Sequence, residues 1–405
     1  MSRRAWLWVT FCIIHVGVAI LGWREPNWPM GDVAAVYDPW SFRALTGQGI
    51  VGITEPFVYP QLALVPMLLA QLITYLTANY YVAWALLIAA IDAVAFHVLV
   101  RNGRSTSRSY AAGFWLVAMF ALGPIWMYRI DGVTVPLAIM ALLWLAGRPV
   151  VASVLLTVAT WMKVWPAALL GAAFIALRRR WTVAVTAALV SIGVVGVIAA
   201  LGGFRYAFGF VSQQEGRGLQ VEAPVTTPYI WMSYFGVPGA HIRYDNEILT
   251  YQVTGPGMEQ VAAIMTPLMG IVAVAIIAIA AVKAWRGAYF LSLMPPLSLS
   301  LVIALIALNK VGSPQFISWL IAPVVLWMVV DRRRAWKAAG AVLVLCILTH
   351  FIYPIFYWEL LQGFFWINVL LTARNAAEVL LLVLCVIELV RVRTHPQRRA
   401  ALASV

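Results

Sequence analysis

The chain has 405 residues, of which 63% are hydrophobic and only 11% are charged. Apolar stretches as long as these exceed the core that a water-soluble domain can bury. The composition therefore excludes a soluble globule and indicates a polytopic membrane protein surrounded by membrane lipids. The net charge of +13 would suggest nucleic acid for a soluble domain, but basic residues also collect in the cytoplasmic loops of membrane proteins, and we expect no nucleic-acid partner.

The first predicted element is an apolar run near residues 5–22, which follows a basic start. Its length is close to the ~20 residues that a bilayer requires, and no small-residue cleavage site comes after it. We therefore predict a retained first transmembrane helix rather than a signal peptide that is removed.

The segment after this helix, residues 23–60, is predicted to be an outer loop. It contains the text WREPNWPMGDVAAVYDPWSF, in which Glu25, Asp32 and Asp38 stand among aromatic residues and prolines. Prolines break a helix into short pieces and aromatic residues favour headgroup depth, so we expect short juxtamembrane helices here. Asp32 and Asp38 each precede such a piece and are therefore also candidates for helix N-caps.

The number of spans between residues 61 and 177 is open. Apolar runs occur near residues 61–77, 80–100, 111–128, 133–147 and 149–177. If each of them crosses once, the whole chain has about twelve transmembrane helices, and the arginines of residues 101–108 face outward. Alternatively, 61–77 is a re-entrant or juxtamembrane segment, and 149–177 is two short spans that break at the text WMKVWP, because proline interrupts a helix. Both alternatives give the same number of helices.

The second half of the chain is easier to divide. Six apolar runs occur near residues 181–201, 259–284, 289–308, 315–331, 338–357 and 373–391. Clusters of arginine and lysine flank alternate ends of these runs, and the positive-inside rule assigns those ends to the cytoplasm. We therefore predict a single integral membrane domain over residues 1–405, in the plasma membrane, with both termini cytoplasmic. Residues 23–60 and 202–258 are then the two long outer segments.

Five segments of the chain resemble those of a known family. They are the GD of residues 31–32, FVYPQLALVPMLLAQL at 57–72, WMKVWPAALL at 161–170, EGRGLQVEAPVTTPYIW at 215–231 and NKVGSPQFISWLIAP at 309–323. Together with the order of helices and loops, they resemble the actinobacterial polyprenol-phosphate-mannose-dependent mannosyltransferases, membrane glycosyltransferases of the GT-C fold that are grouped as GT87. The likeness covers nearly the whole chain, and RGLQVEA and KVGSPQF are its most specific parts.

Within that family, the text WPMGDVAAVY is most similar to members that add an α-1,2-linked mannose to phosphatidylinositol mannosides. Members that branch lipomannan or lipoarabinomannan share the same layout. The resemblance implies an all-α GT-C fold and an enzyme that works on the outer face of the plasma membrane. Such an enzyme transfers mannose with inversion from polyprenyl-phosphate mannose to a mannosyl hydroxyl of a phosphatidylinositol mannoside.

This chemistry needs few kinds of residue. An inverting displacement needs one carboxylate that takes the proton of the acceptor hydroxyl, and the departing lipid phosphate needs a cation. The essential aspartate of the family follows the first helix, and Asp32 is the residue that matches it, so the resemblance implies that Asp32 is the general base. His350, in the text LTHFIYP, is a candidate for assisting proton transfer, and Lys310 and Arg217 are candidates for binding the donor phosphate.

Six further residues are candidates for binding sugars. Hydrogen bonds can come from Glu222, Gln315 and Ser313, and stacking can come from the rings of Tyr37, Trp40 and Tyr59. Plainer explanations exist for several candidates, since a lysine at headgroup level snorkels, a lone histidine in a helix packs, and aromatic residues form belts at the membrane surface. No DxD-like carboxylate cluster stands in the sequence, so we expect no metal and no other cofactor.

Two functions of other classes remain open. A transporter or flippase for lipid-linked sugars also needs an outward cavity with cations, but it requires polar groups along the whole path. The charged residues inside the predicted spans are few, namely Asp92, Glu378 and Glu388. A scaffold subunit of a cell-wall assembly would need no carboxylate and cation in one cavity.

Overall fold

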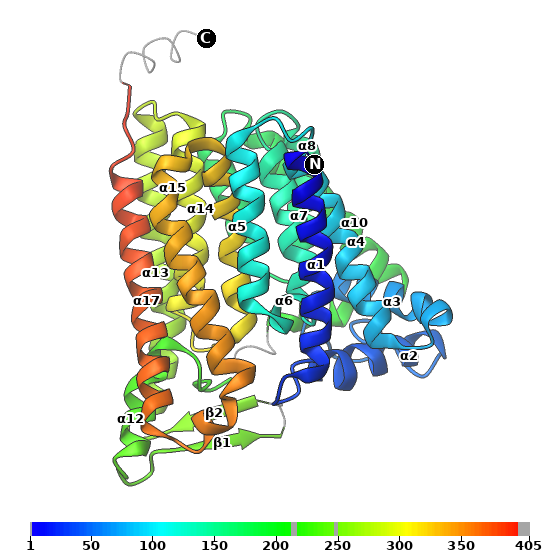
Figure 1. The fold of residues 1–405 in the computed structure, drawn as a ribbon, viewed down its shortest axis with the longest axis vertical. Coiled ribbons are helices and arrows are strands. Elements are labelled where there is room, and N and C mark those ends of the chain that lie inside the picture. Colours follow the sequence, from blue (N-terminus) through cyan, green and yellow to red (C-terminus); the bar gives the residue numbers. More distant parts are fainter. Residues whose placement is uncertain (1, 212–216, 247–249, 396–405) are drawn as a thin grey trace. The chain divides into compact units, whose positions relative to one another are not determined.

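The computed structural model describes residues 2–211, 217–246 and 250–395, and helices form most of this part of the chain (Figure 1). Within it, seven helices are long and apolar enough to cross a membrane: Arg3–Arg24, Tyr80–Val100, Arg180–Ala200, Met258–Trp285, Phe290–Ala307, Pro314–Ile355 and Phe365–Val390. The prediction of a helical membrane protein is confirmed to this extent, whereas the GT-C fold and twelve spans stay predictions. An antiparallel pair of strands, which the sequence analysis did not predict, lies in the segment 202–258.

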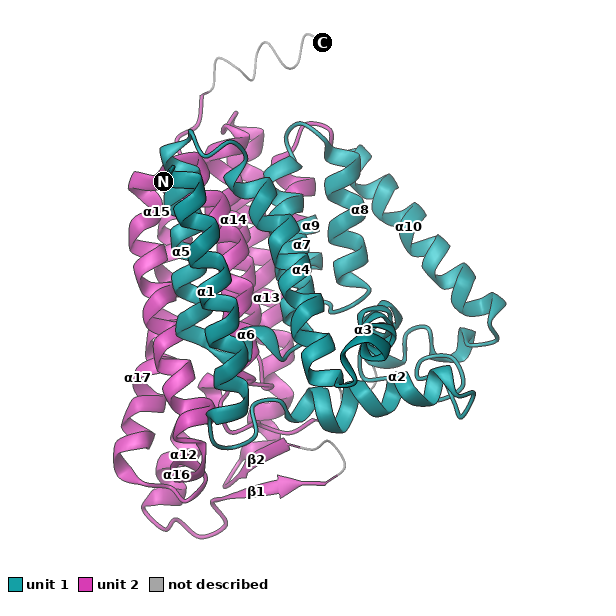
Figure 2. Ribbon diagram, turned by 45° about the vertical axis from the view of Figure 1, so that its right-hand side comes forward, with its two compact units in different colours: residues 1–170, 181–216 teal, residues 171–180, 217–405 magenta. Residues whose placement is uncertain are grey.

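The chain forms two compact units, which Figure 2 draws in different colours. Unit 1 comprises residues 1–170 and 181–216, and unit 2 comprises residues 171–180 and 217–405. The elements of unit 1 are α1 (Arg3–Arg24), η1 (Val33–Tyr37), α2 (Asp38–Leu45), η2 (Gln61–Ala63), α3 (Leu64–Thr77), α4 (Tyr80–Val100), α5 (Thr106–Leu122), α6 (Pro124–Met127), α7 (Asp131–Trp144), α8 (Pro149–Thr160), α10 (Arg180–Ala200) and η3 (Phe204–Tyr206). The elements of unit 2 are η4 (Pro224–Thr226), α12 (Thr227–Tyr234), β1 (His241–Asp245), β2 (Thr250–Thr254), α13 (Met258–Trp285), α14 (Phe290–Ala307), η5 (Pro314–Leu320), α15 (Ile321–His350), η6 (Phe351–Ile355), α16 (Tyr357–Leu361) and α17 (Phe365–Val390). The helix α9 (Ala167–Ala176) contains the boundary between the units.

The start of α1 lies beside the turn between α4 and α5. A Cβ atom on Gly103, which has φ +73°, would lie 2.8 Å from the Cβ of Arg4. The arginines of residues 101–108 therefore share one end of unit 1 with the start of the chain. This arrangement favours the alternative in which 61–77 does not cross the membrane, and η2 and α3 together span only residues 61–77, fewer than the ~20 that a crossing requires.

The predicted break at WMKVWP is confirmed. Helix α8 ends at Thr160 and α9 begins at Ala167, so the run 149–177 contains two helices. The turn between them is joined to η2, because the backbone N–H of Leu62 donates to the carbonyl of Trp161 at 2.9 Å. The indole of Trp161 in turn donates to the hydroxyl of Ser191, in α10, at 2.9 Å.

A buried polar network connects three helices of unit 1. One carboxylate oxygen of Asp92 in α4 accepts a hydrogen bond from the indole of Trp126 in α6 at 2.8 Å, and it lies 3.1 Å from Nε2 of His15 in α1. The other ring nitrogen of His15 lies 2.9 Å from the carbonyl oxygen of Phe11. A carboxylate inside an apolar helix needs such partners, and here they join α1, α4 and α6.

In unit 2, α15 is kinked and consists of two helical segments, called arms below. The continuous segment Pro314–Ile355 has 42 residues, about 63 Å of helix, which is twice the thickness of a bilayer core. The backbone leaves helical geometry at Asp331 (φ −147°, ψ 83°). The predicted runs 315–331 and 338–357 are therefore the two arms, with arginines where they meet.

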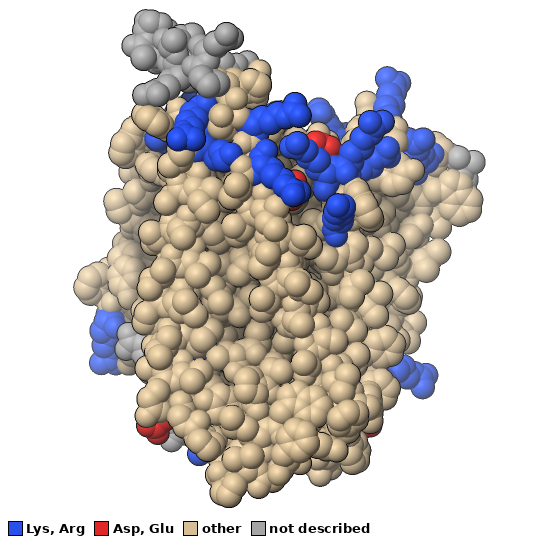
Figure 3. Space-filling view, turned by 90° about the vertical axis from the view of Figure 1, so that its left-hand side faces the viewer, with Lys and Arg blue, Asp and Glu red and all other residues tan. Residues whose placement is uncertain are grey.

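Basic residues collect at the ends of the long helices in unit 2. The ammonium group of Lys283, in the last turn of α13, donates to the carbonyl of Val392, just after α17, at 3.0 Å. Figure 3 shows one face of the protein with Lys and Arg side chains gathered at one end and a wide, almost uncharged band below them. A wide face almost without charge is what contact with lipid requires.

Helix α17 carries a buried cation between two carboxylates. Arg374 lies 2.6 Å from an oxygen of Glu378, one turn further along, and 3.3 Å from an oxygen of Glu222. Its guanidinium also donates to the backbone carbonyl of Glu222 at 2.9 Å. All three side chains are at most 3% exposed. The group fastens the segment before η4 to α17.

We expect Arg374→Met to lower the free energy of unfolding by about 3–5 kcal/mol, because it leaves the buried carboxylate of Glu378 without its cation. The matched control is Arg391→Met, directly after the same helix, because Arg391 is 70% exposed and pairs with Glu388. That pair contributes about 0–1 kcal/mol. Thermal or denaturant unfolding in detergent measures both, and equal losses in the two variants would contradict the expectation.

Candidate functional site

The segment that follows α1 makes one tight turn and then a helix. Asn27 and Trp28 have positive φ values of 57° and 51° and turn the chain. Asp32 already has helical dihedral angles (φ −63°, ψ −37°), and its side chain makes no capping hydrogen bond. Helix η1 then runs directly into α2, so Asp38 lies within a continuous helix. The N-cap interpretation of both aspartates is therefore wrong, as is the division of this stretch into several short helices.

The side chain of Asp32 pairs with a buried arginine. Its carboxylate oxygen lies 3.5 Å from Nη1 of Arg129, and the side chains are 33% and 7% exposed, respectively. The same Nη1 donates to the carbonyl oxygens of Pro29 at 3.1 Å and Tyr128 at 3.3 Å. The guanidinium thus fastens the turn before Asp32 to the segment between α6 and α7, and it holds Asp32 at a partly open position.

A second ion pair is formed two residues further along the chain. Asp131, the first residue of α7, is 1% exposed and lies 2.7 Å from the ammonium of Lys163, which is 12% exposed. The same ammonium stands 5.8 Å from the centre of the Tyr59 ring. Close by, the indole of Trp165 donates to the hydroxyl of Thr134 at 3.1 Å. The WMKVWP turn is therefore held against the start of α7 by charge and by hydrogen bonding.

Two tyrosines lie between these pairs. The hydroxyl of Tyr37 accepts a hydrogen bond from the backbone N–H of Ile130 at 3.1 Å, and it is also bonded to the hydroxyl of Tyr59. Burial, together with the charges of Asp32 and Asp131, raises the pKa values of Tyr37 and Tyr59 well above the ordinary value. Both phenols are therefore protonated at neutral pH, and they can donate hydrogen bonds but cannot act as bases.

The aromatic residues of the cluster differ in exposure. Tyr37 is fully buried, so its ring packs within the protein, against Trp84 at 4.8 Å between ring centres, and it cannot stack on a sugar as predicted. Trp40 and Tyr59 are only partly buried, and both pack edge-on against Phe57. Stacking of these two rings on a sugar stays a prediction.

The two most specific motifs of the sequence meet in unit 2. The backbone N–H of Gln220, in RGLQVEA, donates to the carbonyl of Lys310, in KVGSPQF, at 3.0 Å. A Cβ atom on Gly312 would lie 2.2 Å from the backbone nitrogen of Ala223. Only glycine permits this approach of the two backbones. The glutamate and glycine that precede Arg217 lie outside the described residues.

Other predicted residues of unit 2 differ in burial. Glu222 is the buried partner of Arg374, and Gln315 is 9% exposed, so neither presents an open surface for a sugar. Sugar binding by these two residues stays a prediction. Arg217, Lys310, Ser313 and His350 are partly exposed, with His350 as the last residue of α15.

Three members of the unit 1 cluster were not predicted. Arg129 and Asp131 stand in the text MYRIDGV, where two opposite charges interrupt an apolar stretch, and that interruption was the available signal. Lys163 lies in the predicted helix break at WMKVWP, where no role was predicted for it. Among the residues that the structure describes, no three His, Cys, Asp or Glu side chains lie close enough together to hold a metal ion.

Comparison of the chain with family models, with curated proteins and with solved structures found no match. The resemblance described above therefore rests on the quoted motifs alone. The chemistry has to be argued from the cluster of Asp32, Arg129, Asp131 and Lys163.

We expect Gly312→Ala to destabilise unit 2 by about 3 kcal/mol or more, because the added methyl group meets backbone atoms that cannot move aside. Gly340→Ala is the matched control, since a Cβ there has nothing within 4 Å and lies in a helix. Its stability should be unchanged or slightly raised. Unfolding temperature and the yield of monodisperse protein report the effect, and a stable Gly312→Ala protein would show that the two motifs do not pack this closely.

Proposed function

We propose that the protein transfers mannose, with inversion, from polyprenyl-phosphate mannose to a mannosyl hydroxyl of a phosphatidylinositol mannoside, forming an α-1,2 link on the outer face of the plasma membrane. The observation that carries the proposal is the state of Asp32. Its carboxylate is one-third exposed, it is held by a buried arginine, and it is close enough to Tyr37 and Tyr59 to act on them electrostatically. The resemblance of the motifs supplies the substrate class.

Asp32 has the features that a general base requires. Asp131 is buried and neutralised by Lys163, and the phenols of Tyr37 and Tyr59 stay protonated. Asp32 is therefore the carboxylate of this cluster that an acceptor hydroxyl can reach. One base suits inversion, since a retaining mechanism would need two accessible carboxylates ~5 Å apart.

The proposed step forms one bond and breaks one. The acceptor hydroxyl oxygen attacks the anomeric carbon, the bond from that carbon to the phosphate oxygen breaks, and the hydroxyl proton moves to Asp32. Polyprenyl phosphate leaves with the bonding electron pair. Arg129 would keep the carboxylate in place, and Lys163 would stabilise the phosphate, a role for which Lys310 and Arg217 are also candidates.

We expect Asp32→Asn to lower kcat by about 10²–10⁴-fold while the protein remains folded, because the amide cannot accept the proton. The assay combines purified protein, polyprenyl-phosphate mannose and a short phosphatidylinositol mannoside. Asp38→Asn is the matched control, because it makes the same change in the same helix at a side chain that is bonded to Gln71 rather than to an arginine. Its activity should stay near that of the native chain.

Other results would change the proposal in defined ways. Product from the native chain with nearly full activity in Asp32→Asn would keep the enzyme class and move the base elsewhere, with His350 next. Product only with lipomannan as acceptor would favour the branching enzymes of the same family. A third result would favour the flippase: no product forms, but a labelled lipid-linked sugar crosses the membrane of proteoliposomes at the same rate with the native protein and with Asp32→Asn.

We also propose that transfer needs no metal. The sequence has no DxD-like group of carboxylates, and the cluster around Asp32 contains the cations Arg129 and Lys163. Excess EDTA should leave the rate within about twofold of the untreated enzyme, since a catalytic metal would contribute several kcal/mol. Loss of activity in EDTA that a divalent cation restores would overturn this expectation.

A further inference from the structure

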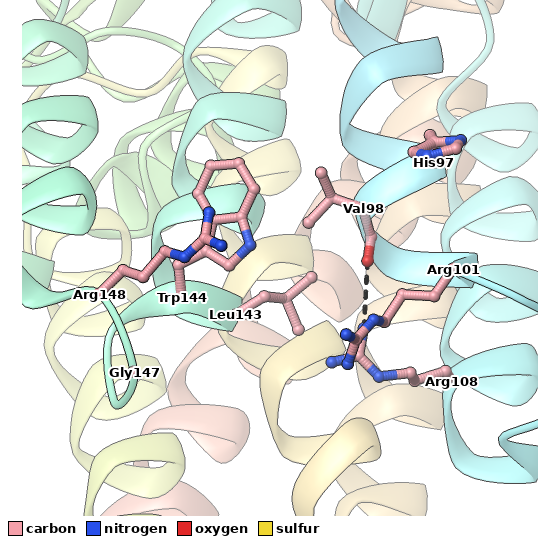
Figure 4. Close-up of a pocket in the computed structure, with 8 residues that line it drawn as sticks. All are labelled: His97, Val98, Arg101, Arg108, Leu143, Trp144, Gly147 and Arg148. Atoms are coloured by element: carbon pink, nitrogen blue, oxygen red, sulfur yellow. Dashed lines mark hydrogen bonds between the residues drawn. The ribbon is translucent and has the colours of Figure 1, made fainter.

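A cavity of about 420 Å³ lies in unit 1, where two helices end and two begin (Figure 4). His97 and Arg101 come from the end of α4 and the residue after it, and Arg108 comes from the first turn of α5. Trp144 ends α7, and Arg148 directly precedes α8. The cavity is therefore built from four helix ends and belongs to a different place in unit 1 than Asp32.

The charge of this cavity is uncompensated. Three arginines line it, and none of the lining residues is acidic. No ion pair in the described chain includes Arg101, Arg108 or Arg148. In Figure 4 the guanidinium groups of Arg101 and Arg108 converge beside the carbonyl of Val98, so their charges repel each other. A third positive charge shares the same cavity.

Local structure explains only one of these charges. Nη1 of Arg108 donates to the carbonyl oxygens of Val98 at 3.1 Å and Leu99 at 2.9 Å, at the negative end of the α4 dipole. Arg101 and Arg148 are exposed and have no such role. All three arginines nevertheless line one cavity.

The surroundings favour an anion with an apolar part. A neighbouring hollow of about 450 Å³ shares Arg101 and Arg108 and also includes Ser105, which caps the N-terminus of α5. The positive end of that 17-residue helix adds to the arginine charges. On the other side, Leu143 and Trp144 give the cavity an apolar wall. A phosphate group attached to hydrocarbon fits both features.

We propose that the pocket of Arg101, Arg108 and Arg148 binds the phosphate headgroup of an anionic phospholipid. The pocket shares its end of unit 1 with the start of α1, since Gly103 packs against Arg4, and it lies at the end of the membrane-spanning helix α4. Headgroup phosphates stand at this depth in a bilayer. The inference does not depend on the mannosyl transfer proposed above.

The test is native mass spectrometry of the full chain in detergent, titrated with phosphatidylglycerol, phosphatidylcholine or glycerol phosphate. The pocket variant is Arg101→Gln/Arg148→Gln, which changes two exposed side chains and leaves the hydrogen bonds of Arg108 in place. The matched control is Arg3→Gln/Arg104→Gln, because these exposed arginines carry the same charge at the same end but do not line the cavity.

We expect the native chain and the control to bind phosphatidylglycerol equally and the pocket variant to bind it about 30-fold more weakly, since two arginines near an anionic surface account for a factor of this size. Phosphatidylcholine should bind more weakly to the native chain, with little difference between the two variants. Equal losses in the pocket variant and the control, or no loss in either, would overturn the site. Binding of glycerol phosphate as strong as that of the lipid would overturn the lipid as its source.

Discussion

Every charge that this protein places among apolar side chains must have a partner, and that constraint arranges most of its polar residues. An unpaired ion in such surroundings costs several kcal/mol. Asp92 accordingly meets His15 and Trp126, Asp131 meets Lys163, and Arg374 stands between two carboxylates. Because Asp92 and its two partners come from three different helices, that network also fixes how α1, α4 and α6 pack within unit 1.

Asp32 differs from the buried paired carboxylates in one respect. Asp92, Asp131 and Glu378 are at most 1% exposed, whereas Asp32 is 33% exposed although its arginine is buried. The buried Arg129 holds the turn at Pro29 through a hydrogen bond, and the partly exposed Asp32 presents a carboxylate oxygen at the surface. That asymmetry is the physical reason for assigning chemistry to Asp32 and structure to the rest.

The long helices could be predicted because length and hydropathy determine them. The run 80–100 is α4 to the residue, and the break at WMKVWP follows from its proline and lysine. The partners of Asp32 and Glu222 could not be predicted, because Arg129 and Arg374 are far away in sequence and no local pattern selects them. The N-cap interpretation of Asp32 failed for a related reason. Aspartate is favoured at the residue before a helix, but the side chain of Asp32 pairs with the distant Arg129. The backbone of Asp32 is already helical.

The Asp32 cluster and the arginine pocket of unit 1 differ in net charge, and the difference fits the proposed function of each. The cluster at Asp32 holds two carboxylates and two cations, so it is close to neutral. Such a site attracts a phosphate only weakly, so an enzyme can release the phosphate product after each reaction cycle. Transfer of a proton also changes the electrostatic potential of a nearly neutral site little. The arginine pocket holds three cations and no carboxylate. It would retain an anion instead of releasing it, and a retained phosphate would relieve the repulsion between Arg101 and Arg108, so a lipid bound there would stabilise the ends of α4 and α5.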